Sequence, residues 1–305
     1  MTQPTTYYWE DLLGGYRSYL KLEKSVAAPT VEAYNSDVSK FIRYLEATGR
    51  EDLTAADITA DLLREFITEI SKLGIGPRTQ ARLISGIKSF FKYLFLENIL
   101  TLNPAELLES PKIGRKLPEV LTVGEIDKII GTIDLSHPQG QRNKAMLETL
   151  YSCGLRVSEL VDLRISNLYF NEGFIKVTGK GSKERLVPIS YRAIREIERY
   201  IPDRNHLEID PAYEDILFLN RLGRKLTRVM IFTIIKDLSL KTGIKKTVSP
   251  HTFRHSFATH LMEGGADLRA IQEMLGHESI QTTEIYTHMD KDYLRSTILE
   301  FHPRA

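Results

Sequence analysis

Helix-start and helix-stop residues divide segment 249–290 into short pieces, and this punctuation constrains the fold more than any other feature of the chain. Ser249 followed by Pro250 is typical of a helix start, because serine caps an N-terminus and proline fits the first turn. A glycine pair at 264–265 is typical of a helix stop. The pattern therefore predicts a first helix over about residues 251–262.

Two further short helices are predicted on the same segment. Residues 267–275 form the second, which ends at Gly276 and leaves His277 just beyond a rigid helix end. Ser279 is placed to cap a third helix, which carries Tyr286. The segment thus mounts a histidine and a phenol on consecutive short helices.

The start of the first helix has the features of a phosphate-binding corner. His251 and Arg254 stand three residues apart, so their side chains leave the same face, close to backbone N–H groups that favour an anion. A phosphodiester attacked by a phenol requires cations on its non-bridging oxygens, a proton acceptor for the nucleophile and a proton donor for the leaving alkoxide. This segment contains most of that set.

Other interpretations of these residues are weaker. His251 and His255 have the spacing of a zinc-binding helix, but no glutamate occupies the general-base position and the chain has one cysteine, so we expect neither a metal nor another cofactor. Tyr286 is one of fourteen tyrosines, and an isolated tyrosine is more often half-buried in a core. Its spacing from the histidines and arginine favours the nucleophile.

Two upstream features fit the same chemistry. Arg156 follows a Gly-Leu helix junction with Glu159 one turn later, although such a pair alone is more often a surface ion pair. The stretch FIKVTGKGSKERLVPI predicts a two-stranded hairpin with Lys180 in its turn. A lysine there could protonate a leaving oxygen, or it could be an ordinary solvated turn lysine, as Lys183 could be.

Taken together, these residues resemble a known catalytic set. In this order and spacing, six of them are similar to the active-site residues of the tyrosine recombinase (integrase) family: Arg156, Lys180, His251, Arg254, His277 and Tyr286. The strings GLRVSEL, GKGSKERLVP, HTFRHSFATHL, LGHESIQTTEIYTH and the terminal HPRA resemble the bacterial Xer recombinases within that family. The similarity covers most of residues 110–305 and, more loosely, the part before them.

The resemblance implies a mechanism. Tyr286 would attack the scissile phosphate to give a 3′-phosphotyrosyl intermediate and a free 5′-hydroxyl, without metal or nucleotide. Three side chains would hold the non-bridging oxygens: Arg156, Arg254 and His277. The remaining three would act in support: His251 in proton transfer at the tyrosine, Lys180 as the proton donor to the 5′-oxygen, and Glu159 in orienting the network.

The fold that we expect is mainly α, in two domains that close on DNA as a clamp. Apolar residues recur at helical spacing through residues 1–108, which predicts a helical domain, and the resemblance implies that it is a SAM-like core-DNA-binding domain. Residues 109–120, rich in proline and basic residues, are the expected linker. Residues 121–305 would form a mixed α+β catalytic domain with a small antiparallel sheet around residues 173–190.

Basic clusters indicate where DNA could bind. A net charge of +1 does not by itself indicate a nucleic-acid ligand, so any affinity for DNA must come from local clusters of basic residues. The helix predicted over residues 77–98 has a strongly apolar face and an opposite basic face, which in isolation is more often simply solvated. The candidate DNA-binding residues are Arg78, Arg82, Lys88 and Lys92 on this helix, and Lys183 and Arg185 in the hairpin.

Partners and location follow from the resemblance and the composition. The single Cys153 is consistent with a reducing cytoplasm, and no window is apolar enough to cross a bilayer. The resemblance implies double-stranded DNA at a specific, dif-like site, a homo- or hetero-tetramer with a second Xer-type recombinase, a septal DNA translocase of the FtsK type, and resolution of chromosome dimers. Mobile-element integration, DNA relaxation by a type IB topoisomerase and catalytically inactive DNA binding are the alternatives.

The C-terminal tail carries a last apolar stripe. Its members recur at helical spacing: Tyr293, Leu294, Ile298 and Leu299. The stripe is too short to stabilise a separate domain, so it needs a partner surface. The resemblance implies docking onto a neighbouring protomer in a ring of four, and the alternative is packing against the chain's own catalytic domain.

Overall fold

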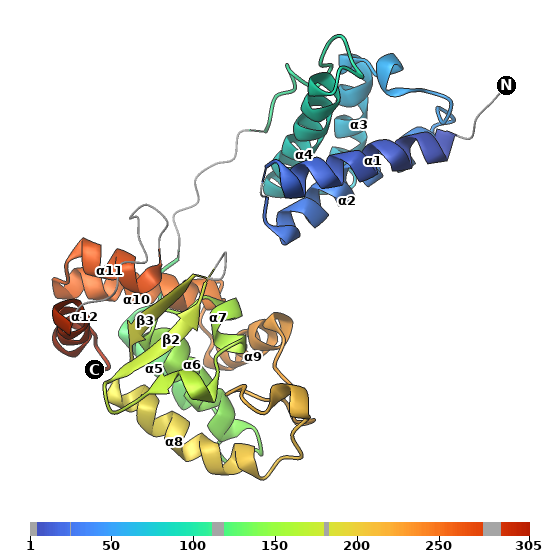
Figure 1. Ribbon diagram of the computed structural model, residues 1–305. Coiled ribbons are helices and arrows are strands. Elements are labelled where there is room, and N and C mark those ends of the chain that lie inside the picture. Colours follow the sequence, from blue (N-terminus) through green and yellow to red (C-terminus); the bar gives the residue numbers. More distant parts are fainter. Residues whose placement is uncertain (1–4, 25, 112–118, 180–182, 277–287) are drawn as a thin grey trace. The chain divides into compact units, whose positions relative to one another are not determined.

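The computed structural model describes residues 5–24, 26–111, 119–179, 183–276 and 288–305. Chain contacts divide it into two compact units, Met1–Lys116 and Leu117–Ala305, which are described separately below (Figure 1). No helix in the described ranges is both long and apolar enough to cross a membrane.

The N-terminal unit is helical. Its described residues form the α-helices α1 Thr5–Leu22, α2 Ala28–Ala47, α3 Ala60–Lys72 and α4 Pro77–Leu96, with a short 3₁₀ turn, η1, at Ala55–Asp57. Helix α4 begins as the sequence predicts, with Pro77 in the first turn after Gly76. Its predicted apolar face is buried: Leu83, Ile84, Ile87, Phe90, Phe91 and Leu94.

Aromatic rings form the centre of this unit. Phe41 of α2 packs edge-on against Phe66 of α3, with 5.2 Å between ring centroids, and Tyr16 of α1 packs in the same way against Phe90 of α4, also at 5.2 Å. Such pairs add to the apolar area that the rings bury. Helices α1 to α4 therefore share one hydrophobic core, and the face of α4 opposite its apolar residues lies outside that core.

The C-terminal unit is mostly helical around a small sheet. Its helices are α5 Val123–Gly131, α6 Gly140–Ser152, α7 Val157–Val161, α8 Tyr191–Asn205, α9 Arg228–Thr242, α10 Pro250–Gly264, α11 Leu268–Leu275 and α12 His288–Phe301, with 3₁₀ turns η2 Ile165–Asn167 and η4 Pro211–Tyr213. The strands are β1 Leu168–Tyr169, β2 Phe174–Thr178 and β3 Glu184–Pro188. The mainly α architecture with a small antiparallel sheet confirms the predicted fold class.

The predicted hairpin is present as β2 and β3. The pairing is antiparallel, with Ile175 opposite Val187 and Thr178 opposite Glu184. Strand β1 extends the sheet to the order β1-β2-β3 and was not predicted, because its two residues are too few to show an alternating pattern.

Helix α6 forms the centre of this unit. It is buried along nearly its whole length and packs against α8 on one side and α10 on another. Phe253 and Phe257 of α10 are fully buried in the same core. Figure 1 shows α10 and α11 beside the β2–β3 hairpin, so the core fixes both relative to the sheet.

The two predicted helices of segment 249–276 are confirmed with small changes at their ends. Helix α10 runs two residues past Met262, and the predicted glycine stop is confirmed, since Gly265 ends the helix with a φ of 103°. Helix α11 is capped by Asp267 and ends at Gly276, with a φ of 66°. Only glycine adopts such backbone angles at little cost, so local chemistry sets both ends.

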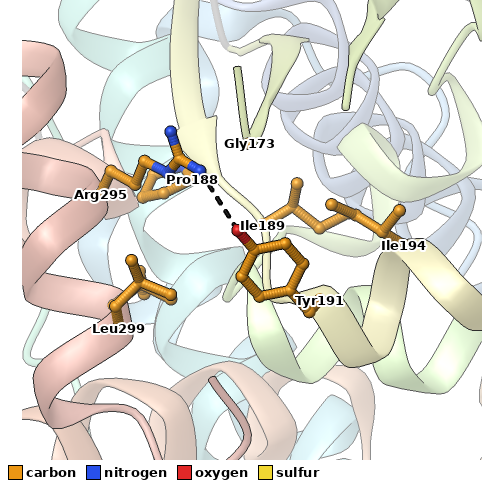
Figure 2. Close-up of a pocket in the computed structure, with 8 residues that line it drawn as sticks. Gly173, Pro188, Ile189, Tyr191, Ile194, Arg295 and Leu299 are labelled. Atoms are coloured by element: carbon orange, nitrogen blue, oxygen red, sulfur yellow. Dashed lines mark hydrogen bonds between the residues drawn. The ribbon is translucent and has the colours of Figure 1, made fainter. Parts of the chain in front are cut away.

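The C-terminal tail packs against its own domain. Leu294 and Ile298 of α12 are each 1% exposed and face α10, α11 and β3. Figure 2 shows the edge of this contact, a small pocket where Arg295 of α12 donates a hydrogen bond of 3.4 Å to the Tyr191 hydroxyl, beside Leu299. In this single chain the tail therefore has the alternative arrangement, packing against its own catalytic domain.

Candidate active site

Arg156 and Glu159 form a buried, oriented pair at the start of α7. The Arg156 backbone N–H donates to Glu159 Oε2 at 2.8 Å, and Arg156 Nη1 donates to Oε1 at 2.9 Å. Glu159 is 3% exposed, whereas about a third of the Arg156 side chain reaches solvent. The alternative of a surface ion pair is therefore wrong. The glutamate is an internal anchor and the arginine presents a fixed face.

Arg185 completes the coordination of this carboxylate. Its Nη1 and Nη2 donate to Glu159 Oε1 and Oε2 at 2.7 Å and 2.9 Å, a bidentate arrangement. Burial by itself would raise the pKa of Glu159, but the hydrogen bonds and charges of Arg185 and Arg156 outweigh it and hold that pKa below its ordinary value. Glu159 is therefore a carboxylate at neutral pH.

Arg254 projects from α10 toward the same carboxylate. Its Nη1 donates to the Gly154 carbonyl at 2.7 Å, its Nη2 donates to the Leu275 carbonyl at 2.6 Å, and Nη1 lies 3.9 Å from Glu159 Oε2. Burial, with the nearby positive charge of Arg156, lowers the pKa of Arg254 to about 10. The guanidinium stays charged at neutral pH in a place where a phosphate would be strongly attracted.

Two glycines allow the helices to meet at this point. Gly154 has a φ of 55°, and a Cβ there would lie 2.3 Å from Cδ1 of Phe257 in α10. A Cβ on Gly276 would lie 3.1 Å from three guanidinium atoms of Arg185, while the Gly276 carbonyl accepts a hydrogen bond of 3.1 Å from Arg156 Nη2. The missing side chain at Gly154 leaves room for Phe257 of α10, and the one at Gly276 allows Arg185 to approach the backbone.

Of the other four predicted catalytic residues, the structure describes only His251. His251 is exposed in the first turn of α10, one turn before Arg254. Lys180, His277 and Tyr286 lie outside the described residues.

A cleft of about 580 Å³ opens beside this cluster. Arg156, Glu159 and Gly179 line it at the cluster, and three further cations line it beyond: Arg164, Lys176 and Lys225. Each of these three is within 4.0 Å of a carboxylate, from Asp215, Glu184 and Asp162 respectively. The cations are therefore partly neutralised, and Arg156 is the lining cation whose carboxylate partner is fully buried.

The predicted DNA-binding residues fall into two groups. Arg78 and Lys92 of α4 and Lys183 of the hairpin are exposed and free to meet a ligand. Arg82 instead forms an ion pair with the fully buried Asp37 and donates to the Ala33 carbonyl, and Lys88 donates to the Leu108 carbonyl at 3.0 Å.

Arg185 needs the larger correction. It is 8% exposed and held by Glu159 and by the Met274 carbonyl, so its guanidinium does not face a ligand. Its supporting place beside Glu159 was missed, although the strand pattern held a signal. Arg185 and Val187 alternate on the buried side of β3, and a charged residue in that phase indicates a buried partner.

Comparison with known proteins identifies the family of this chain. A model of the phage integrase family matches residues 119–292, and a model of the phage integrase N-terminal SAM-like domain matches residues 13–98. The tyrosine recombinase XerD of Chlorobaculum tepidum is 42% identical, over 97% of this chain and 98% of the relative. XerD of Listeria innocua is 41% identical, over 97% of this chain and 99% of the relative.

A solved structure supports the fold. The XerH site-specific recombinase, bound to palindromic difH substrate in a post-cleavage complex, has a TM-score of 0.74 and 22% sequence identity, and the match covers 97% of this chain and 96% of that one. The chain belongs to the phage integrase family and is a tyrosine recombinase, an enzyme that exchanges DNA strands. Within the family it is most like XerD, which is what the terminal string HPRA indicates in preference to XerC.

Proposed function

We propose that this recombinase resolves chromosome dimers at a specific, dif-like DNA site during segregation and cell division, with Tyr286 as its nucleophile. The observation that carries the proposal is the cluster of Arg156 and Arg254 around buried Glu159. The residue just before Lys180 and the residue just before His277 both border this cluster.

The chemistry follows from the charges. The Tyr286 oxygen would attack the scissile phosphorus and lose its proton toward His251, while the bond from phosphorus to the 5′-oxygen breaks. Arg156 and Arg254 would lower the barrier by meeting the negative charge that grows on the non-bridging oxygens, with His277 completing the set. These donors are already fixed by backbone carbonyls and Glu159, so they need little reorganisation.

The leaving oxygen needs a proton. Lys180, in the turn between β2 and β3, would donate it to the 5′-alkoxide, which gives a free 5′-hydroxyl and a 3′-phosphotyrosyl bond. The covalent bond conserves the phosphodiester, so a 5′-hydroxyl from another strand can reverse the step. Exchange and religation use the same residues.

The domains would share the binding of DNA. We assign residues 1–108 to core-DNA binding, residues 109–120 to the linker and residues 121–305 to catalysis. Exposed Arg78 and Lys92 on α4, and Lys183 on the hairpin, support contact with the phosphate backbone of duplex DNA. We further propose that the protein acts in the cytoplasm, in a homo- or hetero-tetramer with a second Xer-type recombinase, and that a septal translocase of the FtsK type is a partner. The match to two XerD relatives over nearly their whole length supports the Xer part of this proposal.

Replacing the nucleophile tests the reaction. Tyr286→Phe removes one oxygen and should bind its site while forming no covalent adduct on a nicked suicide substrate, resolved on a denaturing gel. The wild type should form the adduct, also in the presence of a chelator. An adduct in Tyr286→Phe, or none in the wild type, would contradict the assignment.

The biological role needs a separate test. The sequence that the protein protects on its own chromosome should be a single dif-like site. Deletion of the gene should leave unresolved chromosome dimers, and protection of the ends of a mobile element instead would favour an integrase.

A further inference from the structure

We propose that Arg185 is a positioning residue of the strand-exchange site, acting through Glu159 to hold Arg156 and the ends of β2 and α11 in place, without touching DNA. The inference rests on the proposed function, because it concerns the same site. It replaces the DNA-binding role that the sequence indicated for this arginine.

Arg185 joins three separate elements. From β3 it donates twice to Glu159 of α7, and its Nε donates at 2.8 Å to the Met274 carbonyl near the end of α11. Its guanidinium also packs on Gly276, where a Cβ would be 3.1 Å away, and a Cβ on Gly179 would be 3.5 Å from Nη1. Gly179 and Gly276 directly precede Lys180 and His277 in the sequence, so the Arg185 guanidinium lies beside the residue before each of these two predicted catalytic residues.

The connection to the phosphate-binding cation runs through the carboxylate. Glu159 accepts hydrogen bonds from the backbone N–H and Nη1 of Arg156, and Arg156 Nη2 reaches the Gly276 carbonyl. Arg156 can therefore keep its orientation only while Glu159 is ionised and Gly276 stays in place. Arg185 secures both conditions.

Loss of Arg185 should make Glu159 titrate in an accessible range. The charged groups that face this carboxylate are Arg185 from β3, Arg156 at the start of α7 and Arg254 from α10, with Arg254 more distant at 3.9 Å. Without Arg185 the buried carboxylate loses its bidentate partner, and its pKa rises. A protonated Glu159 accepts the Arg156 hydrogen bonds less well, so cleavage should slow as the pH falls through that raised pKa.

The experiment compares Arg185→Met with the wild type in single-turnover cleavage of the suicide substrate across pH. Arg185→Met should cleave roughly 10–100-fold more slowly near neutral pH, the cost of a misplaced group at a reacting centre. The ratio of the variant rate to the wild-type rate should rise with pH and then level off. Arg185→Lys, which keeps the charge but not the bidentate fork, should fall between them.

DNA binding separates positioning from contact. For Arg185→Met, the slope of log affinity against log salt should equal that of the wild type, whereas loss of a phosphate contact reduces that slope by about 1. A reduced slope would show that Arg185 meets DNA and would overturn the proposal. The double variant Arg185→Met with Glu159→Gln should cleave slowly with no extra pH dependence relative to the wild type, because the titrating group is gone.

Arg204→Met is the matched control. Arg204 is also buried in the same domain, but within the described residues its guanidinium donates to the carbonyls of Glu214 and Ile216 and to the Asn205 side-chain amide oxygen, and to no carboxylate. It should lower the melting temperature without adding a pH-dependent step to cleavage. If Arg185→Met shows the same behaviour as Arg204→Met, the role is structural and the proposal fails. A wild type that forms no adduct would overturn the proposed function itself.

Discussion

Arg304, the penultimate residue, forms a buried ion pair with Glu148 of α6, 156 positions earlier in the chain. The side chains are 1% and 0% exposed. Arg304 also pairs with Asp127 of α5 and lies over the Tyr151 ring, 5.7 Å from its centroid. Two residues of the terminal HPRA string, His302 and Arg304, are therefore buried in the catalytic domain.

This contact predicts that the last residues stabilise the domain. Arg304→Ala leaves Glu148 buried without its main partner, which should cost about 3–5 kcal/mol in the free energy of unfolding. Arg192→Ala removes the second partner of the same carboxylate, but Arg192 is 48% exposed and should cost much less. Thermal melting of both variants checks the order. Equal, small effects would mean that the tail is not held in this way.

His302 predicts an acid sensitivity. Burial, with His260 and Arg304 nearby, lowers the pKa of His302 from 6.5 to about 3. Between about pH 6.5 and pH 3, His302 is therefore protonated in the unfolded chain and neutral in the folded chain. This difference lowers the free energy of unfolding as the pH drops through that range, by up to about 1.4 kcal/mol per pH unit. His302→Gln should remove this part of the slope in unfolding curves. An unchanged difference between variant and wild type across that range would contradict it.

Lys180 can be separated from Lys183 by substrate chemistry. Lys180→Ala should cleave about 10²–10⁴-fold more slowly, because the 5′-alkoxide lacks its proton donor. A sulfur at the bridging 5′ position leaves without protonation, so cleavage of a 5′-phosphorothiolate should recover in Lys180→Ala and not in Arg156→Ala. Lys183→Ala, which alters an exposed hairpin side chain, should cleave each of the two substrates at a rate similar to that of the wild type. Absence of rescue would assign Lys180 to binding.

The basic face of α4 should divide into two kinds of residue. Arg78→Ala should weaken DNA binding and reduce its salt slope by about 1, with no change in melting temperature. Arg82→Ala should leave the buried Asp37 short of a partner and destabilise the fold by about 1–3 kcal/mol. Its salt slope should not change once the protein is kept folded. The reverse pattern would return Arg82 to the DNA interface.

The sequence by itself determined the features that depend on neighbours along the chain. Ser249, Pro250 and Gly276 set the starts and ends of α10 and α11 through caps and backbone angles that act over a few residues. The alternation around Gly179 determined the hairpin. The order and spacing of the predicted catalytic residues indicated the family, because the proposed chemistry requires those groups whatever their surroundings.

The tertiary structure decided which cationic side chains form ion pairs within the protein and which remain exposed. Arg82 meets Asp37 across 45 positions and Arg185 meets Glu159 across 26, and periodicity shows which face a residue occupies but not what lies opposite. The same limit applied to the tail, whose apolar stripe predicted a partner without identifying it. Buried charge is tolerated only when paired, so the partners supplied by the fold determine whether an arginine binds DNA or holds the site together.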